Sequence, residues 1–148
     1  MPRVYIDASV VGGCFDPGFS DESLALFDMA RRGDIILVIS DLLVAEIEKA
    51  PENVRGFLAA VPPNLVETVE IEDEAVALHS AYLAAGVVGA SSENDALHVA
   101  AASVADCDII VSWNFRHIVH FDKIRGYNAV NIREGYGVIA IHSPKEVV

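Results

Sequence analysis

The chain has 148 residues, of which 53% are hydrophobic and 22% are charged, and this balance excludes an intrinsically disordered protein. Its length suits a single domain over residues 1–148, and no apolar run approaches the roughly 20 residues that cross a bilayer. The formal net charge of −12 complicates any nucleic-acid-binding function, because phosphate binding normally requires a basic face.

The chain begins without the basic segment and apolar run of a secretory signal peptide. Its two cysteines, Cys14 and Cys107, stand alone, without a CxxC motif. A disulfide between them is possible, but nothing in the pattern requires one. We therefore expect a cytoplasmic protein in a reducing environment.

The charges are unevenly distributed: most acidic residues precede residue 112, whereas the segment 112–133 is basic. The charged residues of this segment are Asp122, Arg116, Lys123, Arg125 and Arg133. Such a segment predicts either a small basic patch on an acidic body or scattered, solvated charges.

Short apolar runs of strand length alternate along the chain with segments of helical period. A first strand is expected over residues 4–6, followed by a loop that contains Gly12, Gly13, Pro17 and Gly18. Beyond it we predict helices over 20–32, 41–49, 51–60, 72–85 and 92–105, strands over 35–39, 66–71, 109–111 and 138–141, and short helical turns within 114–128. This alternation predicts an α/β protein, an α/β/α sandwich with a central parallel sheet of four to five strands, whose order the pattern does not reveal.

Polar residues follow two of the predicted strands. Asp7 comes directly after the first strand, and Asn114 lies three residues beyond Val111. Sites in open parallel sheets form outside the carboxyl ends of the strands, so both positions are candidates; for Asp7 the alternative is an ordinary turn residue. Ser9 and Ser112 lie two residues from these side chains, and their hydroxyls fit a hydrated cation site or a contact to substrate.

Glu46 falls on the apolar side of its predicted helix. With Leu42 at zero on a helical wheel, Glu46 lies near roughly 40° and Ile47 near roughly 140°. A buried carboxylate is either paired or bound to metal. A buried salt bridge is the alternative to a metal ligand, and the sequence offers only Lys49 as a local basic partner.

Asp95 lies at the start of the predicted helix 92–105. Ser92 and the acids that follow it resemble a capping box, in which a carboxylate near the helix N-terminus complements the helix dipole. The helix is apolar nearly all round and is therefore expected to be buried. Glu93 and Asp95 compete for the inward position, and spacing alone does not choose between them.

Three carboxylates suffice for magnesium, which prefers hard oxygen ligands and keeps several waters. We therefore predict a metal site of Asp7, Glu46 and Asp95, completed by Asn114. A cation held there would lower the pKa of bound water and neutralise charge on a phosphate group, which is the chemistry of phosphodiester hydrolysis.

Other polar and aromatic residues near these positions each have two possible interpretations. Arg116 is either a phosphate contact or a solvated surface residue. Trp113 either stacks on a base or packs in the core. His98 packs in or beside its helix or acts as a general base. His117 and His120 have the spacing of a zinc pair but lack a clear set of four ligands.

Taken together, four segments of the chain resemble the PIN-domain nucleases, and within them the VapC-type toxins of bacterial and archaeal toxin–antitoxin modules. The matching segments are 4–9, 40–47, 94–102 and 110–115. The resemblance implies a PIN-like fold, dependence on Mg²⁺ or Mn²⁺, cleavage of single-stranded or loop RNA, homodimerisation, and inhibition by a cognate antitoxin. Matched by position, Asp7, Glu46 and Asp95 are the acidic triad, and Asn114 stands where many members have a fourth acid and others an Asn, which weakens the case for a second metal ion.

Two other functions remain open. An aspartate-based phosphoryl-transfer domain also has an Asp after its first strand, but the haloacid-dehalogenase type has a second Asp two residues later, where this chain has Ser9. A PIN-like binding module with little or no catalysis is favoured by Asn114 and by the net charge.

Overall fold

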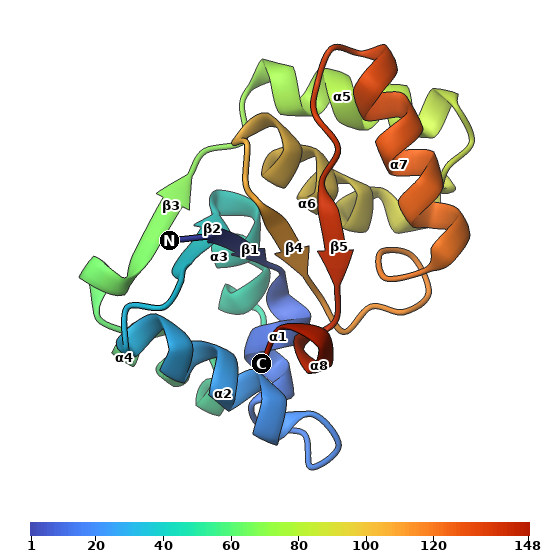
Figure 1. The fold of residues 1–148 in the computed structure, drawn as a ribbon. Helices are drawn as coiled ribbons and strands as arrows, with labels where there is room; N and C mark the ends of the chain where they lie inside the picture. The colour runs from blue at the N-terminus through green and yellow to red at the C-terminus, as the bar shows by residue number, and fades with distance from the viewer.

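The computed structural model describes residues 1–148 and contains a five-stranded sheet (Figure 1). The strands are β1 (Arg3–Ile6), β2 (Ile36–Ser40), β3 (Val66–Val69), β4 (Ile109–Val111) and β5 (Ala140–His142). Their order is β3-β2-β1-β4-β5, and all four neighbouring pairs are parallel. The parallel sheet predicted from the sequence is therefore confirmed.

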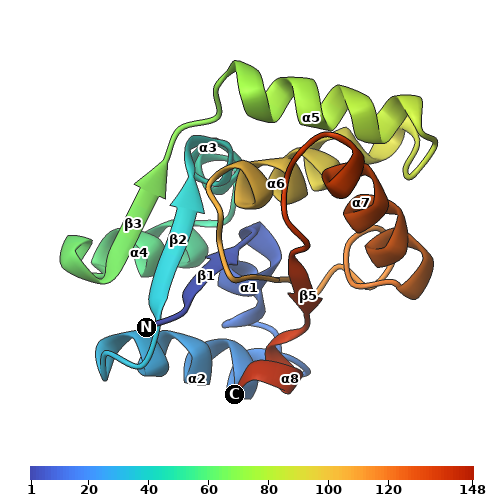
Figure 2. The same cartoon turned by 45° about the horizontal axis from the view of Figure 1, so that its top comes forward.

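Helices cover both faces of this sheet (Figures 1 and 2). They are α1 (Ala8–Gly13), α2 (Ser20–Arg31), α3 (Asp41–Glu48), α4 (Glu52–Ala60), α5 (Asp73–Ala84), α6 (Glu93–Val104), α7 (Phe121–Arg133) and α8 (Pro144–Val147), with two 3₁₀ turns, η1 (Pro63–Leu65) and η2 (Ala90–Ser92). None of them combines the length and the apolar character needed to span a membrane.

Alternate strand residues supply the two cores, because successive side chains of a strand point to opposite faces. Tyr5 and Ile110 pack with the buried residues of α5, α6 and α7. Val4 and Ile6 pack on the other face with residues of α1, α2, α3 and α4. The α/β/α sandwich is therefore confirmed.

The two cysteines lie in these separate cores, Cys107 with α5–α7 and Cys14 on the opposite face. Both thiols are free and buried, and burial raises the pKa of each to about 11. The disulfide that the sequence left open is not formed.

Two segments differ from the sequence prediction. The expected loop after β1 begins with helix α1, and the turns expected within 114–128 give way to the continuous helix α7 from Phe121. In both helices a glycine permits close packing: a Cβ on Gly13 would lie 2.6 Å from Ser23 Oγ, and one on Gly126 would lie 2.9 Å from Val87 Cγ1. These glycines allow neighbours to approach the helices closely, Gly13 at the last residue of α1 and Gly126 inside α7.

Gly13→Ala is therefore expected to destabilise the protein by about 2 kcal/mol, because the added methyl group overpacks a buried contact. Gly12→Ala is the matched control in the same helix, since a Cβ at Gly12 meets no atom within 4 Å. The control should gain up to about 1 kcal/mol from better helix propensity. Urea denaturation of both variants measures the difference, and equal stability would contradict the packing role of Gly13.

The strand order places a switch point at the centre of the sheet. From β1 the chain moves outward through β2 to β3 and then crosses to β4 on the other side of β1. Ligands of open parallel sheets bind at the carboxyl ends of strands at such a point. Asp7, Ser40 and Ser112 stand at the ends of β1, β2 and β4, so the fold brings these three segments to one edge.

Candidate active site

Asp7 is the buried acid at this edge, with 5% of its surface exposed. Ser9 Oγ donates to its Oδ1 at 2.5 Å, and Ser112 Oγ donates to its Oδ2 at 2.7 Å. No cationic side chain is hydrogen-bonded to the carboxylate. Burial raises the pKa of Asp7 because it disfavours the charged form, while His98 and the two hydroxyls lower it in part.

The same two serines join the loop after β4 to the segment after β1. Ser9 Oγ accepts from the backbone N–H of Trp113 at 2.9 Å, and Ser112 Oγ accepts from that of Asn114 at 2.9 Å. Each hydroxyl therefore has a fixed direction, with its hydrogen toward Asp7. The serines orient the carboxylate and hold the two loops together.

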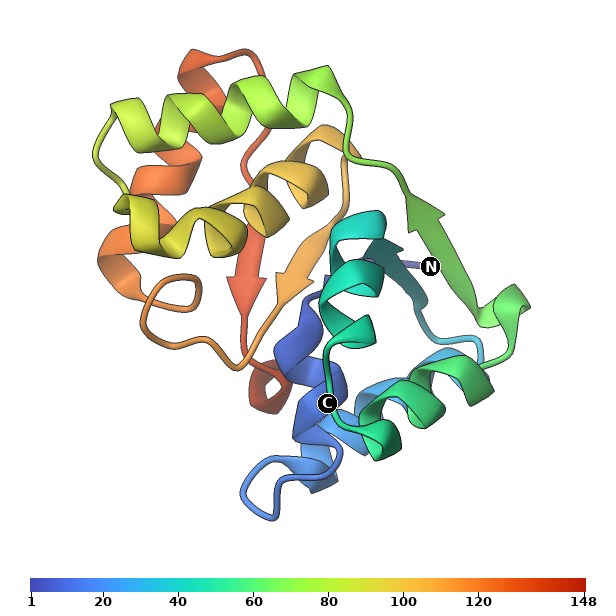
Figure 3. The ribbon, with the colours of Figure 1, turned by 180° about the vertical axis from the view of Figure 1, so that it is seen from behind.

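Glu46 is paired with a histidine from the opposite side of the sheet. His98 Nε2 lies 2.5 Å from Glu46 Oε1, which joins α6 to α3 (Figure 3). The Glu46 side chain is 29% exposed and His98 is 2% exposed. The buried position expected for Glu46 is partly realised, and its partner is His98, not the local Lys49.

A buried hydrogen-bonded chain supports this pair. Tyr5 Oη lies 2.7 Å from His98 Nδ1 and 2.7 Å from Ser40 Oγ. Because a carboxylate only accepts, His98 Nε2 is the donor to Glu46. Burial raises the pKa of Tyr5, so its phenol keeps its proton in this chain.

Asp95 occupies the inward position for which it competed with Glu93. Asp95 is half-buried in the first turn of α6, whereas Glu93 is exposed. Its Oδ2 lies 3.1 Å from His117 Nδ1 in the loop after β4. The capping-box interpretation is wrong, because the Ser92 side chain makes no cap hydrogen bond; Ser92 is the last residue of the turn η2.

Asn114 turns its amide oxygen into its own loop. Oδ1 accepts from the backbone N–H groups of His117 at 2.9 Å and Arg116 at 3.2 Å. The oxygen that would ligate a cation therefore stabilises a turn. Arg116 is exposed and has no acidic side chain within 4.0 Å, so its guanidinium is free for a phosphate, whereas His117 pairs with Asp95.

No three His, Cys, Asp or Glu side chains are grouped as a metal site. The donor chemistry of the edge nevertheless fits a hard cation. Asp7 is a buried carboxylate without a contacting cation, and Glu46 and Asp95 each use only one oxygen in a hydrogen bond. Asp7 is the most buried of the four predicted residues, and the Asn114 oxygen is engaged in its own loop.

His98 and His117 are the site residues whose roles the sequence did not reveal. The spacing of Asp95 and His98, i and i+3, places both on one side of α6, which was the available signal. The contact between His98 and Glu46 spans 52 positions and has no local pattern.

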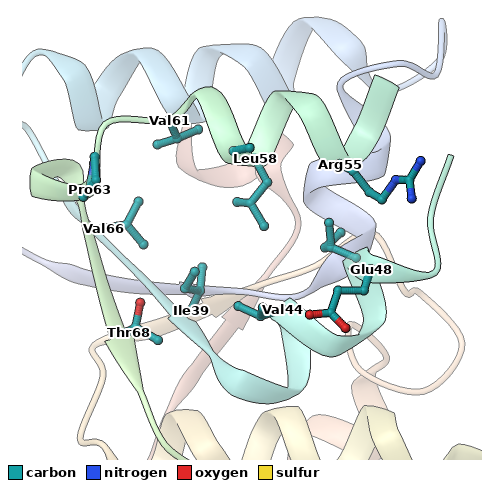
Figure 4. A pocket seen from close by; sticks show the side chains of 11 residues that line it. Ile39, Val44, Glu48, Arg55, Leu58, Val61, Pro63, Val66 and Thr68 are labelled. Atoms are coloured by element: carbon teal, nitrogen blue, oxygen red, sulfur yellow. The ribbon is translucent and has the colours of Figure 1, made fainter. Parts of the chain in front are cut away.

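A separate apolar cavity of about 390 Å³ lies between α3, α4 and β3 (Figure 4). Its charged lining residues are Glu48 and Arg55. Val44 and Glu48 stand two residues from Glu46, roughly 200° around the helix, so this cavity is on the other side of α3 from the acidic edge.

Solved structures share the fold at low sequence identity. VapBC2 from Rickettsia felis, solved with a promoter DNA fragment, has a TM-score of 0.60 at 12% identity, over 95% of this chain and 98% of that one. FitAcB from Neisseria gonorrhoeae has a TM-score of 0.60 at 14% identity, over 96% and 98%. The tyrosyl-tRNA synthetase from Aeropyrum pernix has a TM-score of 0.51 at 13% identity, over 96% and 52%. Such similarity shows the fold alone, and the function has to be inferred from the residues of the site.

Sequence comparison is more specific about the family. No curated protein matches the chain. The model of the PIN domain matches residues 3–116, which includes the acids at 7, 46 and 95 and the loop after β4. Because this match covers most of the chain and the fold agrees with it, the protein belongs to the PIN domain family.

Proposed function

We propose that this protein is a Mg²⁺- or Mn²⁺-dependent endoribonuclease that hydrolyses phosphodiester bonds in RNA. The observation that carries the proposal is Asp7: a buried carboxylate at the switch point of the sheet, oriented by two hydroxyls and contacted by no cation of the protein. A carboxylate in this position favours an external cation, because burial without a counter-charge is costly.

Each side chain of the edge has a role in this proposal. Asp7, Glu46 and Asp95 hold the cation, and His98 and His117 orient the last two acids. A bound magnesium ion supplies a more acidic water and neutralises charge on the phosphate.

Two further groups position Asp7 and the substrate. Ser9 and Ser112 fix the direction of the Asp7 carboxylate. Arg116, exposed beside the site, contacts a substrate phosphate and compensates locally for the net charge of −12.

We further propose that the protein is the toxin of a toxin–antitoxin pair, with an antitoxin as its partner. The support is the resemblance of its motifs to VapC-type toxins and the likeness of its fold to VapBC2 and FitAcB. Copurification with the product of a neighbouring gene, and loss of RNA cleavage in that complex, test this part. A partner that binds without reducing cleavage would contradict it.

Cleavage of an end-labelled single-stranded RNA tests the enzymatic proposal. Cleavage is expected with Mg²⁺ or Mn²⁺, and it should stop when EDTA removes the metal and return when the metal is restored. Cleavage that is equal in EDTA and in Mg²⁺ would contradict metal dependence, and the absence of cleavage with either metal would contradict the enzyme.

The second candidate is a PIN-domain binding module without catalysis. It is favoured by the turned-in oxygen of Asn114 and by the pairing of Glu46 and Asp95 with histidines, which leaves no grouped metal site. Isothermal titration with Mn²⁺ separates the two functions. Heat of binding that Asp7→Asn removes supports the enzyme, whereas no binding supports the module.

A further inference from the structure

A second cavity lies next to Asp7 and is separate from the apolar cavity under α4. Its volume is about 480 Å³, and its lining residues are Ser9, Gly12, Gly13, Asp16, Phe19, Trp113 and Asn114. This volume is within the range of small-molecule sites, roughly 300–1,000 Å³. Ser9 connects it to the candidate site, because the same hydroxyl lines the cavity and donates to Asp7.

One wall of this cavity is an ordered aromatic pair. Phe19 stacks on Trp113 with ring centroids 4.1 Å apart and an angle of 23° between the planes. Trp113 Nε1 donates to Ser23 Oγ at 2.8 Å, which fixes the indole. Nucleobases stack on such rings because every base has an aromatic face, and single-stranded RNA offers its bases unstacked.

Asp16 adds a hydrogen-bond acceptor at the same cavity. Its Oδ1 accepts from the backbone N–H of Gly18 at 2.9 Å, which holds the exposed carboxylate in place and leaves Oδ2 available. A carboxylate only accepts hydrogen bonds. Guanine presents two adjacent N–H donors on its Watson–Crick edge, whereas uracil presents one N–H between two carbonyl oxygens, which repel a carboxylate.

We propose that this cavity is a nucleobase subsite that prefers guanine, with Phe19, which is stacked on the buried Trp113, stacking the base and Asp16 accepting from its edge. The subsite rests on the proposed ribonuclease function, because it would place one base of the RNA beside the phosphate at Asp7. It makes cleavage of single-stranded RNA dependent on a guanine next to the scissile bond.

Binding of nucleoside monophosphates tests the subsite without any cleavage. Trp113 is the single tryptophan, so its fluorescence reports on the cavity directly. In Mg²⁺ buffer, 5′-GMP is expected to quench it with an affinity at least about fivefold higher than that of 5′-UMP. The two nucleotides carry the same phosphate, so the difference isolates the base. Equal affinity for both would overturn the proposal.

Two variants locate the binding. Gly12→Leu should weaken 5′-GMP binding at least about fivefold by filling the cavity, because a side chain there meets no protein atom within 4 Å. Gly56→Leu is the matched control, since Gly56 also lies in a helix with open space around it and does not line this cavity. Asp16→Asn should remove the preference for guanine. Unchanged 5′-GMP binding in Gly12→Leu and Asp16→Asn would overturn the subsite.

Failure of the subsite and failure of the enzyme are distinguishable. RNA cleavage without selective 5′-GMP binding overturns the subsite and leaves the ribonuclease proposal in place. Selective 5′-GMP binding without metal-dependent cleavage supports the subsite and contradicts the enzyme.

Discussion

Asp7→Asn is expected to lower metal-dependent RNA cleavage at least about 100-fold, the cost of losing one well-placed electrostatic group. Asn keeps the shape of the side chain and one acceptor oxygen for the serines but removes the charge that would hold the cation. The rate is measured on end-labelled RNA at saturating Mg²⁺. Asp34→Asn is the charge-matched control, because Asp34 is exposed just before β2, at the opposite edge of the sheet from the acidic triad, and it should retain full cleavage. Equal rates for Asp7→Asn and the wild type would contradict the site.

The stability of Asp7→Asn separates a lost charge from a misfolded protein. Burial raises the folded-state pKa of Asp7 above its ordinary value of 3.8, so the folded protein binds this proton more tightly than the unfolded chain. The contribution of Asp7 to stability is therefore greatest below pH 3.8 and is lost as the pH rises through the folded-state pKa. In EDTA at pH 7, Asp7→Asn should be at least as stable as the wild type, with a smaller difference at low pH, as thermal unfolding measures.

The position of Glu46 illustrates what the sequence can predict about this site. The helical period correctly placed its carboxylate on the inner side of α3, because that property depends on a few neighbouring residues. Its partner His98 comes from a helix 52 positions later on the other face of the sheet. No local pattern predicts such a contact, and so the sequence could indicate that Glu46 is on the inner side of its helix but not which residue it is paired with.

The choice between Asp95 and Glu93 did not depend on where α6 begins, because the helix starts directly after Ser92, as the sequence predicts. Ser92 makes no side-chain cap hydrogen bond, however, and belongs to a 3₁₀ turn over Ala90–Ser92. Helix ends are set by tertiary contacts as much as by capping residues, and here Asp95 pairs with His117 from the loop after β4. The resemblance to PIN nucleases selected Asp95, and Asp95 is the less exposed of the two acids, a difference that spacing alone could not predict.

The strand order and the packing role of Gly13 could not be predicted from the sequence, for the same physical reason: both depend on contacts between distant segments. The crossing from β3 to β4 joins segments that are distant along the chain, and it determines that Asp7 and Ser112 meet. Gly13 was interpreted as part of a loop because glycine is a common breaker. In the structure a glycine is required at this position because Trp113, a residue 100 positions later, lies too close for a Cβ.

His98→Leu is expected to reduce the free energy of unfolding by about 3 kcal/mol, because it removes a buried imidazole ring that is hydrogen-bonded to both Tyr5 and Glu46. The Tyr5 hydroxyl and Glu46 each lose one hydrogen bond, and the loss of a buried hydrogen bond or of one to a charged group costs about 1–3 kcal/mol. For a protein of this size the midpoint of thermal unfolding should fall by roughly 6–12 °C. Urea denaturation and thermal unfolding, both at neutral pH in EDTA, measure the change.

His79→Leu is the matched control for this substitution. His79 is also a buried helical histidine, but its Nε2 has no hydrogen-bond partner, so the same change removes an unsatisfied polar atom. We expect His79→Leu to leave stability unchanged or to raise it by about 1 kcal/mol. If both variants lose the same stability, the loss at His98 reflects ring packing and not its hydrogen bonds. A selective loss at His98 would instead mean that the chain from Ser40 through Tyr5 to Glu46 stabilises the fold and holds a site acid in place.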